Sequence, residues 1–122
     1  SAQDGGISEM KIRVRIKNRS KKVVRRISLI DLVPRIAEVD KTFDSGTPAP
    51  AQIIKNDKKG TLLKWHLDHL DGGEEYIFTY CVKAKYAIIG GATLPVAVAK
   101  FVSADGKERT TFSNRFKVNA IA

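Results

Sequence analysis

Apolar and basic side chains alternate at every position from residue 10 to residue 17. A period of two is typical of a β-strand with one buried face and one face in water. A polar turn follows, and residues 23–33 form a second β-rich run that Pro34 ends. The first strand is predicted to bury Met10, Ile12, Val14 and Ile16 and to expose Lys11, Arg13, Arg15 and Lys17.

The middle of the chain predicts a hairpin and then a long strand. Residues 51–55 and 61–67 form two short strands, and Gly60 supplies a left-handed residue in the turn between them. The second of these strands turns Leu63, Trp65 and Leu67 inward. A glycine turn then leads into a strand over residues 74–86, whose inward face carries Tyr76, Phe78, Tyr80, Val82 and Ala84.

The last two predicted strands lie within residues 90–102 and 109–118. Asp105 and Gly106 between them are a strong hairpin signal. Residues 43–52 are rich in proline and small side chains and predict a loop near a sheet edge. No long segment has helical periodicity, and short strands separated by turns favour an all-β antiparallel β-sandwich.

The length of 122 residues predicts one domain, which we place at residues 9–122. Residues 1–8 begin with Ser1 and are expected to be a flexible tail, a linker or a tag remnant. A single cysteine, Cys81, excludes an internal disulfide. It indicates either a reducing compartment or an organism that does not rely on disulfides outside the cell. No apolar run approaches the ~20 residues that span a bilayer.

Four short motifs follow one another in a recognisable order. DLVP at residues 31–34 closes a strand, and WHLDHLDGGE at residues 65–74 fits a W-x-L-x-x-L-x-x-G-E pattern. Tyr80-Cys81-Val82 and SNRFKV at residues 113–118 complete the set. Over residues 9–119 the chain resembles the conserved immunoglobulin-like repeat domain of archaeal and bacterial cell-surface proteins, an adhesion-related β-sandwich.

The resemblance implies an immunoglobulin-like antiparallel β-sandwich of seven to eight strands. It also implies a domain that spaces, displays or adheres, and it carries over no catalytic residue. Two departures put the usual surface partners in doubt: the first strands are basic rather than rich in Thr and Asp, and Leu94-Pro95-Val96-Ala97 stands where Asn-x-Ala is more usual.

Positive charge is concentrated in one segment. The chain has 22 Lys and Arg and 13 Asp and Glu, a net charge of +9, and residues 11–26 hold nine basic residues and no acidic one. Such a stripe could contact nucleic acid, anionic lipid headgroups or an acidic protein. The candidate contacts, predicted to lie on a hairpin, are Lys11, Arg13, Arg15, Lys17, Arg19, Lys21, Lys22, Arg25 and Arg26.

Two observations favour a solvated face over a binding site. No aromatic residue occurs before Phe43, so the stripe lacks stacking platforms for nucleic-acid bases. Lys and Arg on an outer strand also block pairing between sheet edges. Asn18-Arg19-Ser20 matches a glycosylation triplet in a turn that we expect to be exposed, with Asn18 as the candidate acceptor. Such triplets also arise often by chance.

Other candidate sites have simpler structural interpretations. His66, Asp68 and His69 could bind a metal only if their side chains converged. In a strand His66 and Asp68 share a face, whereas His69 points the opposite way unless the chain turns there. Asp68, Asp71, Glu74 and Glu75 do not have the spacing of an EF-hand and are explained as a turn. Cys81 has no base among its strand neighbours, so we expect a structural thiol.

The sequence therefore predicts a non-enzymatic structural, adhesion or spacer module of a larger cell-envelope protein. The expected partner is a protein or another envelope component, and no cofactor, metal or small-molecule substrate is expected. We place the module at the cell surface or outside the cell, in a membrane-anchored or secreted chain, with the cytoplasm as the alternative. The second hypothesis is a basic module that docks an anionic partner through residues 11–26.

Overall fold

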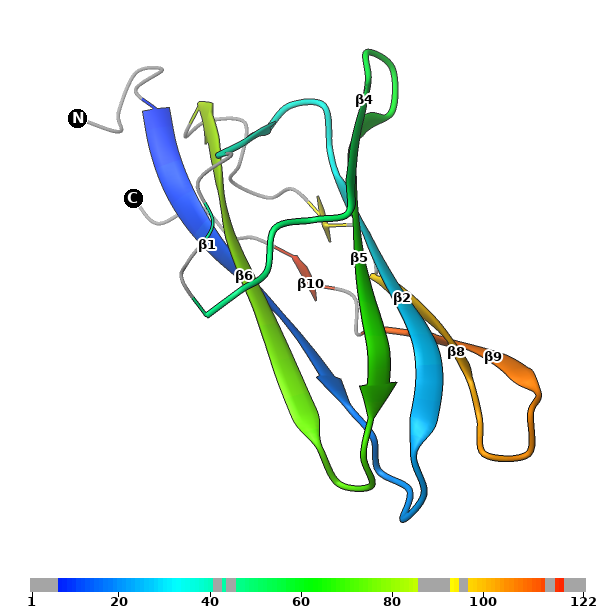
Figure 1. Ribbon diagram of the computed structural model, residues 1–122. Coiled ribbons are helices and arrows are strands. Elements are labelled where there is room, and N and C mark those ends of the chain that lie inside the picture. The colour runs from blue at the N-terminus through cyan, green and yellow to red at the C-terminus, as the bar shows by residue number, and fades with distance from the viewer. Residues whose placement is uncertain are drawn as a thin grey trace.

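The computed structural model describes residues 7–40, 43, 46–85, 93–94, 97–113 and 116–117 (Figure 1). In these residues the chain is all-β, and eight strands form two antiparallel sheets that pack as a β-sandwich. Two further short strands, β7 (Thr93–Leu94) and β10 (Phe116–Lys117), pair with each other. The described residues contain no helix, and so none that is long and apolar enough to cross a membrane. The predicted antiparallel sandwich of seven to eight strands is confirmed.

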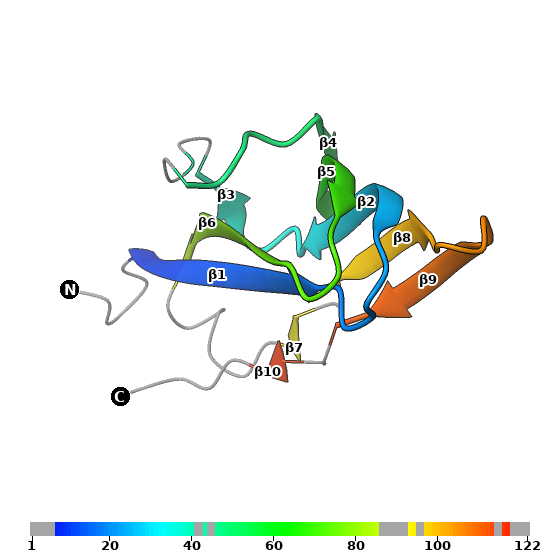
Figure 2. The same ribbon diagram turned by 60° about the horizontal axis from the view of Figure 1, so that its bottom comes forward.

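The smaller sheet contains the strand that the alternation predicts, β1 (Ile7–Lys17), in the order β1–β6–β3 (Figure 2). The apolar residues of β1 pack against the core, and its basic residues from Lys11 to Lys17 are exposed, as predicted. The long strand β6 (Glu75–Lys85) pairs with β1 along its full length. The short strand β3 (Glu38–Val39) pairs with the other edge of β6.

The larger sheet has the order β4–β5–β2–β8–β9. The second predicted strand is observed as β2 and ends directly before Pro34. Both predicted hairpin glycines have positive φ, 112° at Gly60 and 81° at Gly106. The five strands are β2 (Val24–Val33), β4 (Gln52–Asn56), β5 (Gly60–Leu70), β8 (Val98–Val102) and β9 (Glu108–Phe112).

Trp65 on β5 lies in the middle of the core, with 1% of its surface exposed. Its ring lies 5.2 Å from that of Phe78 and 5.8 Å from that of Tyr80, both on the opposite sheet. Its Nε1 donates a 3.0 Å hydrogen bond to the carbonyl of Pro48, which satisfies the polar atom of the indole. The buried apolar residues that cluster with these rings are Val14, Leu29, Val33, Leu63, Val82, Ala97 and Ala99.

A polar pair crosses this core. Asp31 on β2 shares the inward face with Leu29 and Val33 and is 6% exposed. The hydroxyl of Tyr80 on the opposite sheet donates a hydrogen bond to its Oδ2. Burial raises the pKa of Asp31, and the hydrogen bonds from Tyr80 and the Leu32 backbone oppose that shift. Burial, followed by the carboxyl of Asp31, raises the pKa of Tyr80.

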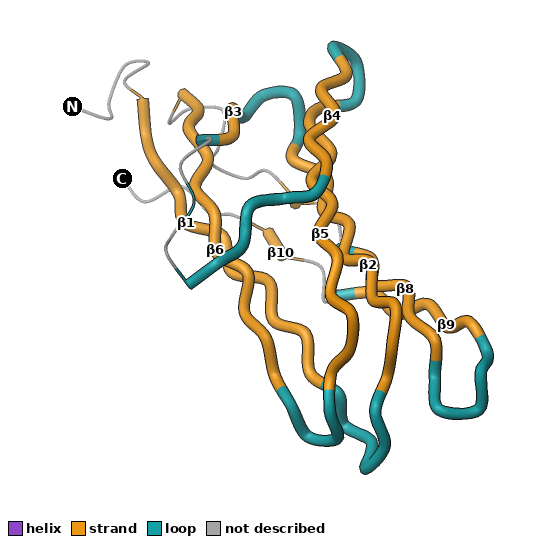
Figure 3. The backbone as a smooth tube through the Cα atoms, viewed as in Figure 1, coloured by secondary structure: helices purple, strands orange, loops and turns teal. Residues whose placement is uncertain are grey.

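The prediction that residues 11–26 form a hairpin is wrong. β1 pairs with β6, whereas β2 pairs with β5 and β8, so the two strands lie in different sheets. Each strand has an apolar face, and packing these faces against each other across the core buries both. The connection at residues 18–23 therefore crosses between the sheets, at the same end of the sandwich as the β5–β6 turn (Figure 3).

The predicted domain boundary is close to the start of the first strand. β1 begins at Ile7, two residues before the predicted domain at 9–122, and residues 1–6 of the predicted tail lie outside the described residues. Also outside them are residues 41–42, 44–45, 86–92, 95–96, 114–115 and 118–122, which include parts of the predicted loop and of the last two predicted strands.

Candidate functional site: an exposed basic surface

The basic side chains singled out in the sequence are all exposed. Those on β1 share its outward face, and the others follow on the connection between the sheets and at the start of β2. They therefore continue from the smaller sheet around one end of the sandwich to the larger sheet. We call this set the basic surface: Lys11, Arg13, Arg15, Lys17, Arg19, Lys21, Lys22, Arg25 and Arg26.

An irregularity at the start of β2 exposes two adjacent arginines. Arg26 has a φ of 51°, and the ladder between β2 and β8 shifts register between Arg25 and Ser28. In a regular strand one of two adjacent side chains would turn inward. A β-bulge adds an unpaired residue, so both Arg25 and Arg26 can face solvent. Alternation alone could not predict this.

Ion pairs neutralise little of the basic surface. Arg15 lies 3.3 Å from Glu75, and both side chains are accessible to water, where such a pair is worth only about 0–1 kcal/mol. In the described part of the chain, the members with no carboxylate within 4.0 Å are Arg13, Lys17, Arg19, Lys21, Lys22, Arg25 and Arg26. Their charge is therefore available to a partner.

Asn18 fixes the backbone from which the basic connection projects. Its Nδ2 donates hydrogen bonds to the carbonyls of Lys22, at 2.7 Å, and Leu70, at 3.0 Å. The backbone N–H of Asn18 donates to the carbonyl of Glu74, and the backbone carbonyl of Asn18 accepts a hydrogen bond from the N–H of Gly73. These bonds attach the connection to the end of β5 and to the β5–β6 turn.

The expectation that Asn18 lies exposed is wrong, whereas its glycosylation stays a prediction. Asn18 is 6% exposed, and its Nδ2, the atom that would carry a glycan, already donates both hydrogens. Ser20 has a structural role in the same triplet, because its N–H and its hydroxyl both donate to Oδ1 of Asn18. A glycan on Nδ2 would displace at least one bond that holds the connection.

The histidines of β5 do not assemble a metal site. His66 and Asp68 are exposed, as alternation predicts, and Nδ1 of His66 lies 3.1 Å from the hydroxyl of Ser28. His69 is also exposed and lies 3.9 Å from Asp71. Within the described ranges, no three His, Cys, Asp or Glu side chains form a group that could hold a metal ion.

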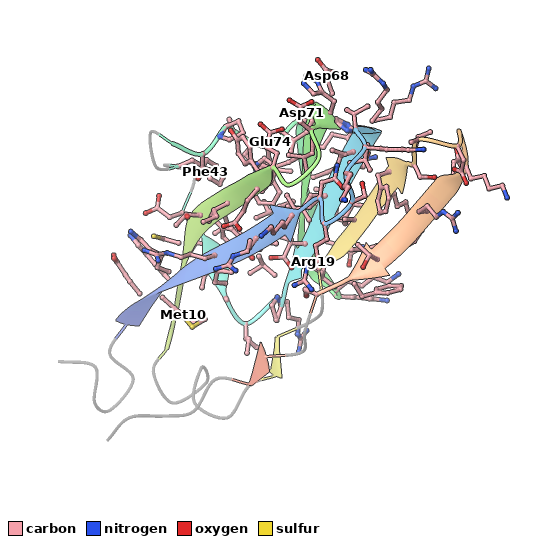
Figure 4. The ribbon with its side chains drawn as sticks, turned by 90° about the horizontal axis from the view of Figure 1, so that it is seen from below. Met10, Arg19, Phe43, Asp68, Asp71 and Glu74 are labelled. Carbon is pink, nitrogen blue, oxygen red and sulfur yellow. The ribbon has the colours of Figure 1, made fainter. Side chains whose placement is uncertain are left out.

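The acidic residues after β5 form the predicted turn. The backbone N–H of Asp71 donates to Oε1 of Glu74 at 2.9 Å, and the N–H of Glu74 donates back to the carbonyl of Asp71. Gly73 between them has a φ of 80°. Figure 4 shows Asp71 and Glu74 at this turn, with Asp68 beyond them at the edge of the molecule.

Cys81 lies on the outward face of β6, opposite Lys11 on β1, and is half-buried. Its carbonyl accepts a hydrogen bond from the N–H of Asp40. Its neighbours Tyr80 and Val82 point into the core, as the strand pattern predicts.

Sequence reasoning missed a groove of about 810 Å³ beside the basic surface. The groove lies between β1 on one side and β8, β9 and their turn on the other. Its inner wall is apolar and includes Val14, Ile16, Ile27, Leu29, Ala99 and Phe101. Phe112, which is 63% exposed, also lines it. The basic side chains that border it are Arg15, Lys17, Arg19, Lys22 and Arg109.

No sequence motif signals this groove, because it depends on which strands form the edges of the two sheets. Figure 4 places Arg19 beyond the end of β1, on the side toward β9. Asp105 is an acidic residue in the lining, and it is engaged by the backbone N–H of Lys107 and by Arg109 at 3.3 Å. The groove thus combines an apolar interior with a positively charged border.

Comparison with known proteins does not assign the chain to a family. No family model matches the sequence, and no curated protein matches it. The resemblance to immunoglobulin-like repeat domains therefore stays a prediction.

Proposed function

We propose that this chain is a non-enzymatic binding module that docks an anionic partner through the basic surface. The observation that carries the proposal is the concentration of exposed charge. Residues 11–26 hold nine basic residues and no acidic one, and all nine side chains are exposed. The excess positive charge of the chain, +9, therefore lies in one region of the sandwich.

The packing of the fold does not require this charge. β1 contributes its alternate, apolar positions to the core and β2 its inward face, and the basic side chains lie outside the core. Like charges gathered on one surface repel one another, which opposes folding. A polyanion would relieve this repulsion and release counterions, so its affinity should fall steeply as salt rises.

Two variants of equal net charge test the proposal. The first replaces Arg13, Arg15 and Lys17 on β1 with glutamine. The control replaces three lysines with glutamine at exposed positions of the β4–β5 hairpin, namely Lys55, Lys58 and Lys59. Binding of each protein to polyglutamate, to anionic vesicles and to a short oligonucleotide is measured over a series of salt concentrations.

We expect the unmodified domain to bind at least one probe, with log affinity linear in log salt. The β1 variant should lose about tenfold or more, because three of the contacting charges are removed, and the control should lose little. If no probe binds at ~50 mM salt, or if both variants lose equally, the charge only solvates the domain and protects the β1 edge.

The second candidate is a structural or adhesion module of a larger cell-envelope protein. Supporting it, the DLVP motif ends β2 with Val33 in the core, and the WHLDHLDGGE motif runs from the buried Trp65 through the end of β5 into the turn after it. The test is labelling of intact source cells with an antibody against this domain. Surface labelling that protease treatment of intact cells removes would support the candidate, and labelling only after permeabilisation would contradict it.

A further inference from the structure

Among the described strands, β1 forms one edge of the smaller sheet, on the side that borders the groove. In the part of the chain that the structure describes, β1 pairs with β6 and no strand lies against its other edge. An unpaired edge presents backbone N–H and C=O groups that can template a further strand. Its hydrogen-bonding pattern determines which residues present those groups.

The pattern follows from the end of the β1–β6 ladder. The N–H of Asn18 donates to the carbonyl of Glu74, the residue opposite it in the register, at 2.9 Å. Positions that bond to the partner strand alternate along an antiparallel pair. Odd-numbered residues of β1 therefore direct their N–H and C=O groups away from β6. Arg15 and Lys17 line the groove, and Arg13 is the next such residue along the same edge.

The side chains of β1 alternate between two faces with the same period of two as its backbone hydrogen-bonding groups. Arg13, Arg15 and Lys17 are exposed on the outward face, whereas Val14 and Ile16 between them point toward the core, where they line the groove. A strand added at this edge would therefore set alternate side chains beside the basic ones and the remainder against the apolar wall. Further positive charge near such a strand comes from Arg19, Lys22 and Arg109.

From this geometry we infer that the groove accepts an extended segment of a partner protein in which acidic and apolar residues alternate, and that the segment adds to β1 as a further strand. The inference rests on the proposed function and narrows its anionic partner to an acidic polypeptide. Acidic side chains opposite the arginines favour the pairing, and apolar ones cover the wall of the groove.

Two other occupants fit less well. A second copy paired through the same edge would place basic side chains opposite basic ones, which destabilises a strand pair. A nucleic acid could neutralise the charge, but it has no repeating N–H and C=O groups to match those of Arg13, Arg15 and Lys17. It would also leave most of the apolar wall uncovered.

Three labelled peptides of equal length test the inference. One alternates Glu and Val, the second has the same composition with all Glu in one block and all Val in another, and the third alternates Lys and Val. Binding is followed by fluorescence anisotropy, and amide hydrogen exchange is measured residue by residue along β1. A labelled oligonucleotide and sedimentation of the free domain test the two other occupants.

Arg15→Pro and Arg15→Ala separate backbone pairing from charge. Both remove the same charge and the same ion pair with Glu75. Proline also removes an N–H that points to the open edge, so no bond to β6 is lost. Retention of the buried emission of Trp65 shows that each variant is folded.

We expect the alternating acidic peptide to bind about tenfold or more tightly than the block peptide, since only it can satisfy both faces at once. It should slow exchange at Arg13, Arg15 and Lys17. The affinity of the alternating acidic peptide should be about fivefold lower for Arg15→Pro than for Arg15→Ala, which is the effect of losing one hydrogen bond. The alternating basic peptide should not bind.

Equal affinity of the two acidic peptides, or equal affinity of the Pro and Ala variants, would overturn strand addition while leaving the proposed function intact. Tighter binding of the oligonucleotide, or self-association that protects β1, would overturn it in favour of those occupants. Failure of every anionic probe would refute the proposed function itself.

Discussion

Replacing Asn18 with alanine should destabilise the domain more than any other polar substitution on the connection between the sheets. The change removes the two hydrogen bonds from Nδ2 to the carbonyls of Lys22 and Leu70. Leu70 is 2% exposed, so its carbonyl would lose a partner in a place that is poorly accessible to water. The bonds that Ser20 donates to Oδ1 are lost as well.

The size of the effect follows from these contacts. Each hydrogen bond contributes about 1 kcal/mol net, and a buried carbonyl left unsatisfied costs about 1–3 kcal/mol. We therefore expect Asn18→Ala to lower the free energy of unfolding by about 2–4 kcal/mol, a large share of the roughly 5–15 kcal/mol of a typical domain. With an m-value near 2 kcal/mol/M, the urea midpoint falls by about 1–2 M.

Urea unfolding followed by Trp65 fluorescence measures this change, with two matched controls. Ser20→Ala removes only exposed or partly exposed bonds and should cost less than about 1 kcal/mol. Asn18→Asp keeps the size of the side chain but turns carboxylate oxygen toward two carbonyls, so it should cost at least as much as alanine. A loss under about 0.5 kcal/mol for Asn18→Ala, or an Asp variant as stable as the parent, would refute the reasoning.

Three other predictions concern the core and the turns. Burial raises the pKa of Asp31, so the stability that this shift contributes is present below pH 3.8 and is lost as pH rises through the folded pKa. In urea titrations, Asp31→Asn should therefore gain stability relative to the parent as pH rises. A difference between the two proteins that stays constant with pH would contradict this. A β-carbon on Gly60 would lie 2.0 Å from the carbonyl oxygen of Val33, so Gly60→Ala should lower the midpoint far more than Gly73→Ala, where no atom lies within 4 Å. The fluorescence of Trp65 should be blue-shifted and resist iodide quenching until the domain unfolds, whereas strong quenching of the native state would contradict its burial.

The sequence predicted the local structure well because local structure has local causes. Alternation located β1 and gave the correct buried face of β6, and a glycine or Asp-Gly pair located the turns before β5 and β9. The exposure of the basic surface followed from the same rule on β1. At the start of β2 the rule was insufficient, because a bulge that depends on pairing with β8 exposes both Arg25 and Arg26.

Errors arose where the outcome depended on contacts between distant parts of the chain. Residues 11–26 contain two strand-like runs joined by a polar turn, which is the pattern of a hairpin. In the structure, however, β1 pairs with β6, and β2 pairs with β5 and β8. The residues around Asn18 predict an exposed side chain, yet the buried hydrogen bond from its amide goes to the carbonyl of Leu70, 52 residues away.

By itself, the sequence determined an all-β chain, the faces of its main strands and the location of its excess charge, because periodicity and composition act within a few residues. Only the tertiary structure decided which strands share a sheet, that Asp31 meets Tyr80 inside the core, and that an apolar groove lies beside the basic edge of β1. The physical reason is that strand pairing and burial depend on the free energy of contacts between residues far apart in the chain. No local pattern contains that information.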